Sequence, residues 1–189
     1  MTTAAMRRIA VVGSTGAGKT TLAKRLALRY GLRHVELDAL FHGPNWMPAP
    51  LDEFRARVAA AIAADGFVVD GNYGAVRDIV WSAVDTLVWL DYSLPLVFAR
   101  TLRRTIVRIR SREELWNGNR EGLANAFASR DSILLWVLRT HARRRRDYPG
   151  FIAAHAIANV VRLGSPDETE AWFRTLELRG SGQPPSAAS

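Results

Sequence analysis

Residues 7–21 read RRIAVVGSTGAGKTT, and this stretch decides the fold. Its first part, RRIAVV, is a short run rich in β-branched residues, as expected for a strand. From Lys19 to Arg29, Leu22, Ala23 and Leu26 recur at helical spacing, which predicts a helix. The segment GSTGAGKTT at the junction matches the pattern GxxxxGK[ST]. The sequence therefore predicts a strand, a phosphate-binding turn and a helix in direct succession.

The turn contains the residue types that hold the phosphates of a nucleotide. Its glycines let successive backbone N–H groups curl around the β-phosphate at a helix N-terminus. Lys19 reaches the β- and γ-phosphates, and the Thr20 hydroxyl supplies an oxygen ligand to Mg²⁺. A chance match is disfavoured because the motif follows a strand and opens a helix, as its mechanism demands. We expect ATP and Mg²⁺ as cofactors, with ATP held by Gly13, Ser14, Thr15, Gly16, Ala17, Gly18, Lys19, Thr20 and Thr21.

Strand and helix patterns alternate along the rest of the chain. Further strands are predicted at 34–37, 66–70, 85–90 and 158–163, and helices at 52–64, from 94 onward, from 123 to about 147 and at 165–180. The helix that begins at 123 should stop before Pro149. This alternation predicts an α/β fold of three layers, with a five-stranded parallel sheet between helices. We expect one domain over 1–179, a disordered tail over 180–189, and ligands at the carboxyl ends of the strands.

Composition excludes several kinds of chemistry. The 189 residues fit one domain, and 48% hydrophobic with 23% charged residues is ordinary for a globular α/β protein. Because the chain has no cysteine, disulfides, thiolate zinc sites and a cysteine nucleophile are excluded. No segment approaches the ~20 apolar residues that span a bilayer. We therefore expect a cytoplasmic protein with no membrane partner, and the sequence leaves its oligomeric state open.

Positive charge is concentrated in one segment of the chain. The formal net charge is +8, and residues 100–146 carry 13 arginines against four acidic residues, a local balance of +9. Arginine suits bidentate phosphate contacts. The segment could serve a phosphate-transfer site or bind nucleic acid. Nucleic acid is a possible but disfavoured partner because no DNA-reading motif accompanies the charge.

The chain resembles P-loop kinases of the adenylate kinase type, in particular the "DNA topology modulation protein" (FlaR-like) group. The resemblance covers nearly all of residues 7–175 and is carried by GSTGAGKTT, HVELDALFHGPNW, GFVVDGNY, DTLVWLD and ELWNGNRE. It implies a nucleoside-monophosphate-kinase-like fold, an ATP- and Mg²⁺-dependent phosphotransferase activity, and a small-molecule or nucleotide acceptor. The acceptor itself is not identified.

Two aspartates take roles from this resemblance. GFVVDGNY resembles the strand end of adenylate kinases at which an aspartate holds a magnesium-bound water, which implies that role for Asp70; a buried or capping aspartate is the alternative. ELDAL resembles the second-strand end of shikimate kinase-like enzymes, which implies that Asp38 is the general base or binds the acceptor. A carboxylate can take the proton of the attacking hydroxyl. Capping of the next segment is the other interpretation of Asp38.

The acceptor pocket is expected near Asp38. His42 and Trp46 follow it in a loop and could line the pocket, although a surface histidine and a packed aromatic are equally compatible with the sequence. Asn72 and Tyr73 stand where adenylate kinases have phenylalanine and proline, and we expect them on the acceptor side. That departure disfavours AMP as the acceptor. No NKxD motif is present, which disfavours a GTPase.

The kinase resemblance also implies a mobile lid that brings arginines onto the transferring phosphate. We expect the lid at about 108–122 and favour Arg104, Arg108 and Arg112, although a solvated helix face is the alternative for each. On the helix that begins at Leu94, the core face should be Leu94, Phe98, Leu102 and either Ile106 or Ile109. The run 143–146 should be a solvated helix end. A small-molecule or nucleotide kinase is thus the leading hypothesis; the alternatives are a nucleic-acid-associated ATPase or DNA topology regulator, and nucleotide binding without turnover.

Overall fold

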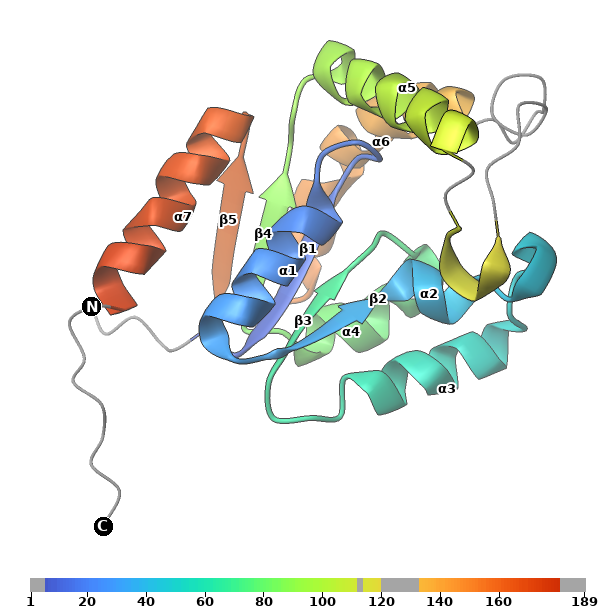
Figure 1. Cartoon of the computed structure of the whole chain (residues 1–189). Coiled ribbons are helices and arrows are strands. Elements are labelled where there is room, and N and C mark those ends of the chain that lie inside the picture. Colours follow the sequence, from blue (N-terminus) through green and yellow to red (C-terminus); the bar gives the residue numbers. More distant parts are fainter. Residues whose placement is uncertain (1–5, 112–113, 120–132, 181–189) are drawn as a thin grey trace.

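Five parallel strands form one sheet in the order β2-β3-β1-β4-β5 (Figure 1). The computed structural model describes residues 6–111, 114–119 and 133–180. The strands are β1 (Arg8–Gly13), β2 (Arg33–Glu36), β3 (Phe67–Asp70), β4 (Thr86–Leu90) and β5 (Asn159–Leu163). The first strand lies at the centre, so the turn that follows it is flanked by the ends of β3 and β4. This arrangement confirms the predicted five-stranded parallel sheet.

Seven α-helices connect and cover the strands within the described residues. They are α1 (Lys19–Tyr30), α2 (Leu37–Phe41), α3 (Leu51–Ala61), α4 (Arg77–Ala83), α5 (Leu94–Ser111), α6 (Ile133–Ala154) and α7 (Pro166–Gly180). Short 3-10 turns occur at Pro44–Trp46, Gly74–Val76 and Trp116–Gly118. Ser165 caps α7 as its sequence predicts, with its hydroxyl accepting a hydrogen bond from the Glu168 N–H at 3.1 Å. None of the described helices combines the length and apolarity needed to cross a bilayer.

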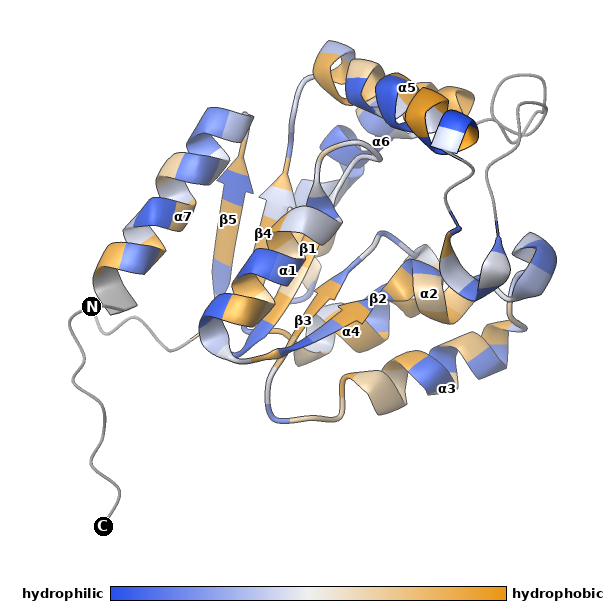
Figure 2. Cartoon of the chain, viewed as in Figure 1, coloured by the Kyte–Doolittle hydropathy of each residue, from blue (hydrophilic) through white to orange (hydrophobic). Residues whose placement is uncertain are grey.

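The sheet separates two hydrophobic cores, which confirms the three layers. Successive residues of β1 point to opposite faces: Ile9 and Val11 belong to one core, and Ala10 and Val12 to the other. Side chains of α1 and α7 complete the first core, whereas α3, α4 and the end of α6 complete the second. In Figure 2 the surrounding helices alternate hydrophilic and hydrophobic residues, as expected for helices with one buried face. Both faces of the central strands are therefore dry.

Several predicted boundaries differ from the structure. Helix α6 does not stop before Pro149; it continues to Ala154. Proline removes one helical hydrogen bond, but Tyr148, Phe151 and Ile152 pack on the second core on both sides of it, and this burial outweighs the loss. Helices α2 and α4 were not predicted. The expected helix start at 123, the tail beyond 180, and residues 112–113 and 120–122 of the expected lid lie outside the described residues.

Helix α5 crosses directly over the phosphate-binding turn. A Cβ atom added to Gly16 would lie 2.4 Å from both the Val97 carbonyl oxygen and the Thr101 hydroxyl of α5. Thr101 donates a hydrogen bond to Val97 O at 2.7 Å, so neither atom can easily move away. Gly16 also has a φ of +83°, a conformation that disfavours any side chain. The absence of a side chain at Gly16 therefore sets how closely α5 covers the turn.

We predict that Gly16→Ala destabilises the protein more than Gly31→Ala. Gly31 also has a positive φ, +62°, but an added Cβ there meets nothing within 4 Å. Its replacement should cost about 1 kcal/mol for backbone strain alone. Gly16→Ala should cost about 1–3 kcal/mol more, because it overpacks the contact with α5. Urea unfolding of the two variants measures both losses, and equal losses would show that α5 does not press on Gly16.

Candidate active site

The phosphate-binding turn runs from the end of β1 into α1, with Lys19 as the first residue of the helix. The Lys19 ammonium lies inside the turn and donates a hydrogen bond to the Ser14 carbonyl at 3.2 Å. Burial lowers the pKa of this ammonium to about 8. The charges of Asp38 and Asp70 oppose that shift, and those of Arg144 and Arg104 add to it. The charges of these four side chains therefore all act on the Lys19 ammonium, and an anion bound there would meet several positive charges.

Asn72 braces the start of the turn. Its side-chain oxygen accepts hydrogen bonds from the Gly13 N–H at 3.2 Å and from the Tyr148 hydroxyl at 3.0 Å, and its amide group donates to the Gly13 carbonyl. The sequence predicts that Asn72 binds the acceptor. In the structure its side-chain amide forms hydrogen bonds with the backbone of Gly13. Its contacts are those of a residue that fixes the joint between β1 and the turn.

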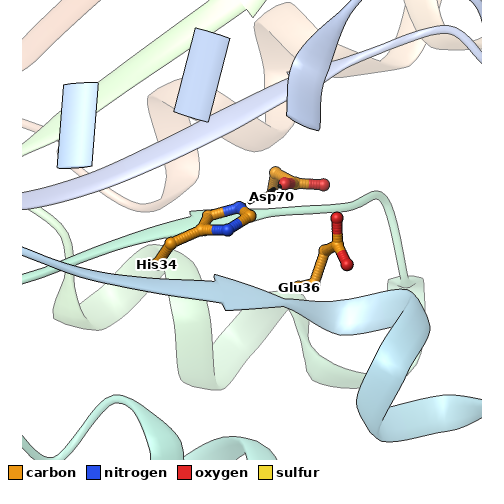
Figure 3. A group of neighbouring side chains, drawn as sticks. All are labelled: His34, Glu36 and Asp70. Atoms are coloured by element: carbon orange, nitrogen blue, oxygen red, sulfur yellow. Dashed lines mark hydrogen bonds and ion pairs between the residues drawn. The ribbon is translucent and has the colours of Figure 1, made fainter. Parts of the chain in front are cut away.

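Thr20 and Asp70, the two residues predicted at the magnesium ion, are brought together. The Thr20 hydroxyl donates a hydrogen bond to Asp70 Oδ1 at 3.1 Å, and the Asp70 side chain is only 2% exposed. Oxygen donors of this kind fit Mg²⁺. His34 contacts the second carboxylate oxygen at 2.7 Å, and Glu36 lies beside the pair (Figure 3). The sequence analysis did not single out His34 and Glu36, although their spacing of two on a strand puts them on one face.

Asp38 lies across from Lys19, in the first turn of α2. The Tyr73 hydroxyl donates a hydrogen bond to Asp38 Oδ1 at 2.6 Å and lies 3.4 Å from His42 Nε2. Burial, reinforced by the Asp38 charge, raises the pKa of Tyr73 far above its usual value, so the phenol stays protonated and remains a donor. Burial also lowers the pKa of His42, which favours the neutral imidazole. Asp38, His42 and Tyr73 thus form one hydrogen-bonded group, as the prediction of a shared acceptor side requires.

Aromatic rings form a wall next to this group. Phe41 packs against Tyr73 with ring centroids 4.7 Å apart, and His42 packs edge-on against Trp46 at 5.2 Å. Trp116, which follows α5 in the chain, stacks on His42 at 6.3 Å with an interplanar angle of 19°. The predicted Trp46 therefore belongs to an aromatic cluster that also contains Trp116, a residue that the sequence analysis did not single out.

Asn119 fixes the loop that carries Trp46. Its side chain accepts a hydrogen bond from the Trp46 N–H at 2.7 Å and donates to the carbonyls of Gly43 at 2.9 Å and Trp116 at 2.8 Å. Asn119 is only 4% exposed. The loop needs such support because Asn45 and Trp46 have φ values of 56° and 58°, in the left-handed region that non-glycine residues rarely adopt. Asn119 therefore holds the loop of Gly43 and Trp46 in its conformation.

The buried face of α5, and with it the environment of Arg104 and Arg108, differs from the sequence-based prediction. The buried positions of α5 are Val97, Thr101 and Thr105, not the predicted face of Leu94, Phe98, Leu102 and either Ile106 or Ile109, because α5 rests on the phosphate-binding turn and on α6. Arg104 and Arg108 are consequently half-buried beside that face. Arg112 lies outside the described residues.

The run 143–146 is not uniformly solvated, which corrects the sequence-based expectation. Arg144 is half-buried, donates to the Thr140 hydroxyl at 2.8 Å, and has a pKa lowered by burial. Arg145 pairs with the buried Asp91 at 2.6 Å. The other two arginines of the run are exposed and pair with Asp147. Helical spacing directs Arg144 and Tyr148, four residues apart, to the same side of α6.

A pocket of about 200 Å³ lies on the other side of the turn, where α1 begins. Its lining includes Thr21, Arg25, Tyr92, Arg100 and Pro166. The Arg100 guanidinium lies 5.7 Å from the centre of the Tyr92 ring, and Pro166 opens α7 after β5. The pocket thus has a planar cation and apolar surface next to the predicted phosphate site, a combination that suits a flat aromatic base.

We predict that Asn119→Ala loosens the acceptor loop. The change removes the Asn119 hydrogen bonds to the Trp46 N–H and the Gly43 carbonyl, which should cost about 1–3 kcal/mol of unfolding free energy. Hydrogen–deuterium exchange should speed up at Trp46 but not in β1. Asn119→Asp keeps the size and one acceptor oxygen but sets a charge against two carbonyls, so it should not restore protection. Asn159→Ala, which removes a single 3.5 Å contact with Thr86, is the control; equal exchange in all three variants contradicts the prediction.

Comparison with known proteins supports the same fold. No model of a known protein family matches the chain. A shikimate kinase of Nitrobacter winogradskyi is 29% identical over 113 residues, which cover 52% of this chain and about half (53%) of that relative. The solved shikimate kinase of Bacteroides thetaiotaomicron superposes with a TM-score of 0.54 at 16% identity, covering 94% of this chain and 99% of that one. The shikimate kinase of Acinetobacter baumannii in complex with shikimate gives 0.56 at 17%, covering 95% and 96%. The chain therefore has the three-layer P-loop fold of these kinases, while the FlaR-like group stays a prediction.

Proposed function

We propose that this protein is an ATP- and Mg²⁺-dependent kinase that phosphorylates a hydroxyl group of a small molecule. The observation that carries the proposal is the arrangement around Lys19, whose buried ammonium is surrounded by Asp38, Asp70, Arg104 and Arg144. A protein that only bound nucleotide would need the turn and Lys19, but not a carboxylate opposite them on the acceptor side. The similarity to shikimate kinases supports a small hydroxylated acceptor.

The nucleotide side of the site follows from the turn. Backbone N–H groups at the start of α1 and the Lys19 ammonium hold the triphosphate. The base occupies the pocket between Arg100 and Pro166. Thr20 and Asp70 would hold an Mg²⁺ ion, Asp70 through a bound water, and such an ion would supply positive charge to the phosphates. Because Asp70 is buried and hydrogen-bonded to Thr20, its carboxylate is fixed in position before any ligand binds.

On the acceptor side, Asp38 takes the proton. The acceptor oxygen attacks the γ-phosphorus, the bond from that phosphorus to the bridging oxygen of ADP breaks, and the hydroxyl proton passes to the carboxylate of Asp38. The hydrogen bond from Tyr73 orients Asp38, while His42 and Trp46 form the wall of the pocket. Arg104 and Arg144 stabilise the charge on the transferring group, assisted by Arg108 and Arg112 of the lid. Positioning and charge stabilisation supply most of the rate, because this transfer needs little covalent help.

The proposal predicts different effects for substitutions on the two sides. Lys19→Ala should lose ATP binding and turnover together. Asp38→Asn should bind ATP normally but transfer phosphate about 10²–10⁴-fold more slowly, since only the proton acceptor is removed. ADP release should be measured with Mg²⁺–ATP and a panel of shikimate, sugars, sugar acids, nucleosides and nucleoside monophosphates, after a thermal-shift screen for binding. Transfer that survives in Lys19→Ala, or ATP binding without turnover on any acceptor of the panel, would count against the proposal.

The pKa of Lys19 predicts a pH dependence of ATP affinity. Since the free protein holds this ammonium at a pKa of about 8, its charge is lost above that pH. Affinity should then fall by up to about tenfold per pH unit, until the pH reaches the higher pKa that Lys19 has beside bound phosphates. Lys19→Arg should flatten the profile, because the guanidinium stays charged. Titration with a fluorescent ATP analogue from pH 7 to pH 10 measures both proteins.

The same pKa shift affects stability in the opposite direction. In the unfolded chain the lysine keeps its proton up to its ordinary value of 10.5, so the unfolded state binds more protons between about pH 8 and 10.5. The lysine's contribution to the free energy of unfolding therefore rises with pH over that range, relative to Lys19→Arg. A fall in affinity caused by general unfolding would instead be accompanied by a fall in stability.

A further inference from the structure

We propose that His34, Glu36 and Asp70, next to Thr20, form a site that takes a divalent first-row transition-metal ion, with the His34 imidazole as a direct nitrogen ligand. The inference concerns the divalent cation of the kinase proposed above and rests on that function, but its test needs no phosphoryl transfer. It differs from the magnesium site proposed above, in which Asp70 acts through a water, because here Asp70 binds the ion directly and His34 adds a side-chain nitrogen.

The backbone brings the three side chains together. Strands β2 and β3 pair in parallel with Glu36 opposite Asp70, and His34 lies two residues before Glu36 on the same face of β2. One ligand atom from each side chain lies within 4.8 Å of the other two. Figure 3 shows all three side chains directed into the same space between β2 and β3. The cluster thus depends on strand pairing, which is rigid, and not on a flexible loop.

The distances suit one shared ion. Two donor atoms about 2.1 Å from an ion lie about 3 Å apart at right angles and about 4.2 Å apart when opposite each other. His34 Nε2 and Asp70 Oδ2 are already 2.7 Å apart. An ion between them replaces the proton of that hydrogen bond and needs only small movements of both side chains. Glu36 offers a carboxylate oxygen within 4.8 Å of the other two ligand atoms, and Asp70 Oδ1 keeps its contact with Thr20 at 3.1 Å.

The donor set selects the class of metal. Mg²⁺ prefers oxygen and keeps several waters, whereas an imidazole favours Mn²⁺, Fe²⁺, Co²⁺ or Zn²⁺ at equal geometry. The two carboxylates would balance the charge of the ion. Glu36 is itself held, because its Oε2 accepts a hydrogen bond from the Trp116 indole at 2.7 Å. Partners of this kind orient a metal ligand before the ion arrives.

Mn²⁺ is the probe for the test, added to the whole chain without nucleotide. Electron paramagnetic resonance should detect bound Mn²⁺, and pulsed measurements should resolve a coupling to one histidine nitrogen. In a competition titration, the affinity of the site for Mn²⁺ should be at least about tenfold higher than its affinity for Mg²⁺. His34→Gln should abolish the nitrogen coupling and weaken Mn²⁺ binding by about 10–100-fold. His155→Gln is the matched control, since that ring lies at the end of α6 against Trp81 and contacts the Phe151 carbonyl.

Two outcomes overturn the inference: Mn²⁺ that binds without a nitrogen coupling, and a chain that binds no Mn²⁺ in the absence of nucleotide. If His34→Gln fails to fold, the coupling in the unsubstituted chain still decides, and Glu36→Gln should keep that coupling while binding Mn²⁺ more weakly. The metal-site inference and the proposed kinase function can be refuted independently. Nitrogen coupling without transfer to any acceptor would leave the metal site standing and remove the kinase, whereas Mg²⁺-dependent transfer without coupling would do the reverse.

Discussion

The joint between β1 and α1 is the constraint on which the rest of the site depends. Strand β1 is buried on both faces and pairs with β3 and β4, so the position of Gly13 is fixed by the whole sheet. Asn72 adds hydrogen bonds to both backbone groups of Gly13, and Tyr148 of α6 holds Asn72 in turn. Helix α5 then covers the turn at Gly16. A phosphate group would therefore meet amide groups that are already oriented, which lowers the entropic cost of binding.

Positively and negatively charged side chains are buried together next to this joint, and they determine which ligand it can bind. The charged residues that act on Lys19 come from separate segments of the chain, and the fold brings them near its ammonium. They are Asp38, Asp70, Arg104 and Arg144. Burial lowers the pKa values of Lys19 and Arg144, and the charges of Arg144 and Arg104 lower that of Lys19 further, so the site without ligand is electrostatically unfavourable for the Lys19 ammonium. A multiply charged anion would relieve that repulsion. The same low-dielectric surroundings strengthen each interaction with it.

Local patterns in the sequence predicted those parts of the molecule that local interactions determine. The turn at 13–21, the five strands and the cap of α7 follow from residue types at fixed spacing, and the ends of β1 and β3 bring Thr20 and Asp70 together as expected. The errors have a common cause in contacts between distant segments. Packing of α6 on the second core carries the helix through Pro149, and α5 buries Thr101 and Thr105 because it lies on Gly16.

The missed site residues have the same origin. Arg144 belongs to an arginine run that resembles a solvated helix end, and only the fold of α6 over the turn brings it near Lys19. In the sequence, nothing distinguishes His34 from other strand residues, because only the pairing of β2 with β3 brings it next to Asp70. Asn119 lies 73 residues from Trp46 in the chain, so no local signal could connect them. Sequence alone could predict the phosphate site because its residues are continuous in the chain, whereas the proposed acceptor side is assembled from separate segments.

The segment 114–119 links two parts of the site that would otherwise be independent. Its Trp116 indole donates to Glu36 on the metal side, while Asn119 fixes the loop of Gly43 and Trp46 on the acceptor side. Since both contacts come from one short turn, a shift of the loop that carries Trp46 would also act on the hydrogen bond to Glu36. That segment also follows α5, the helix that covers the phosphate-binding turn. In the proposed kinase this segment would therefore join the acceptor pocket to the cation site, so that a well-fitting acceptor would stabilise the arrangement that holds the cation.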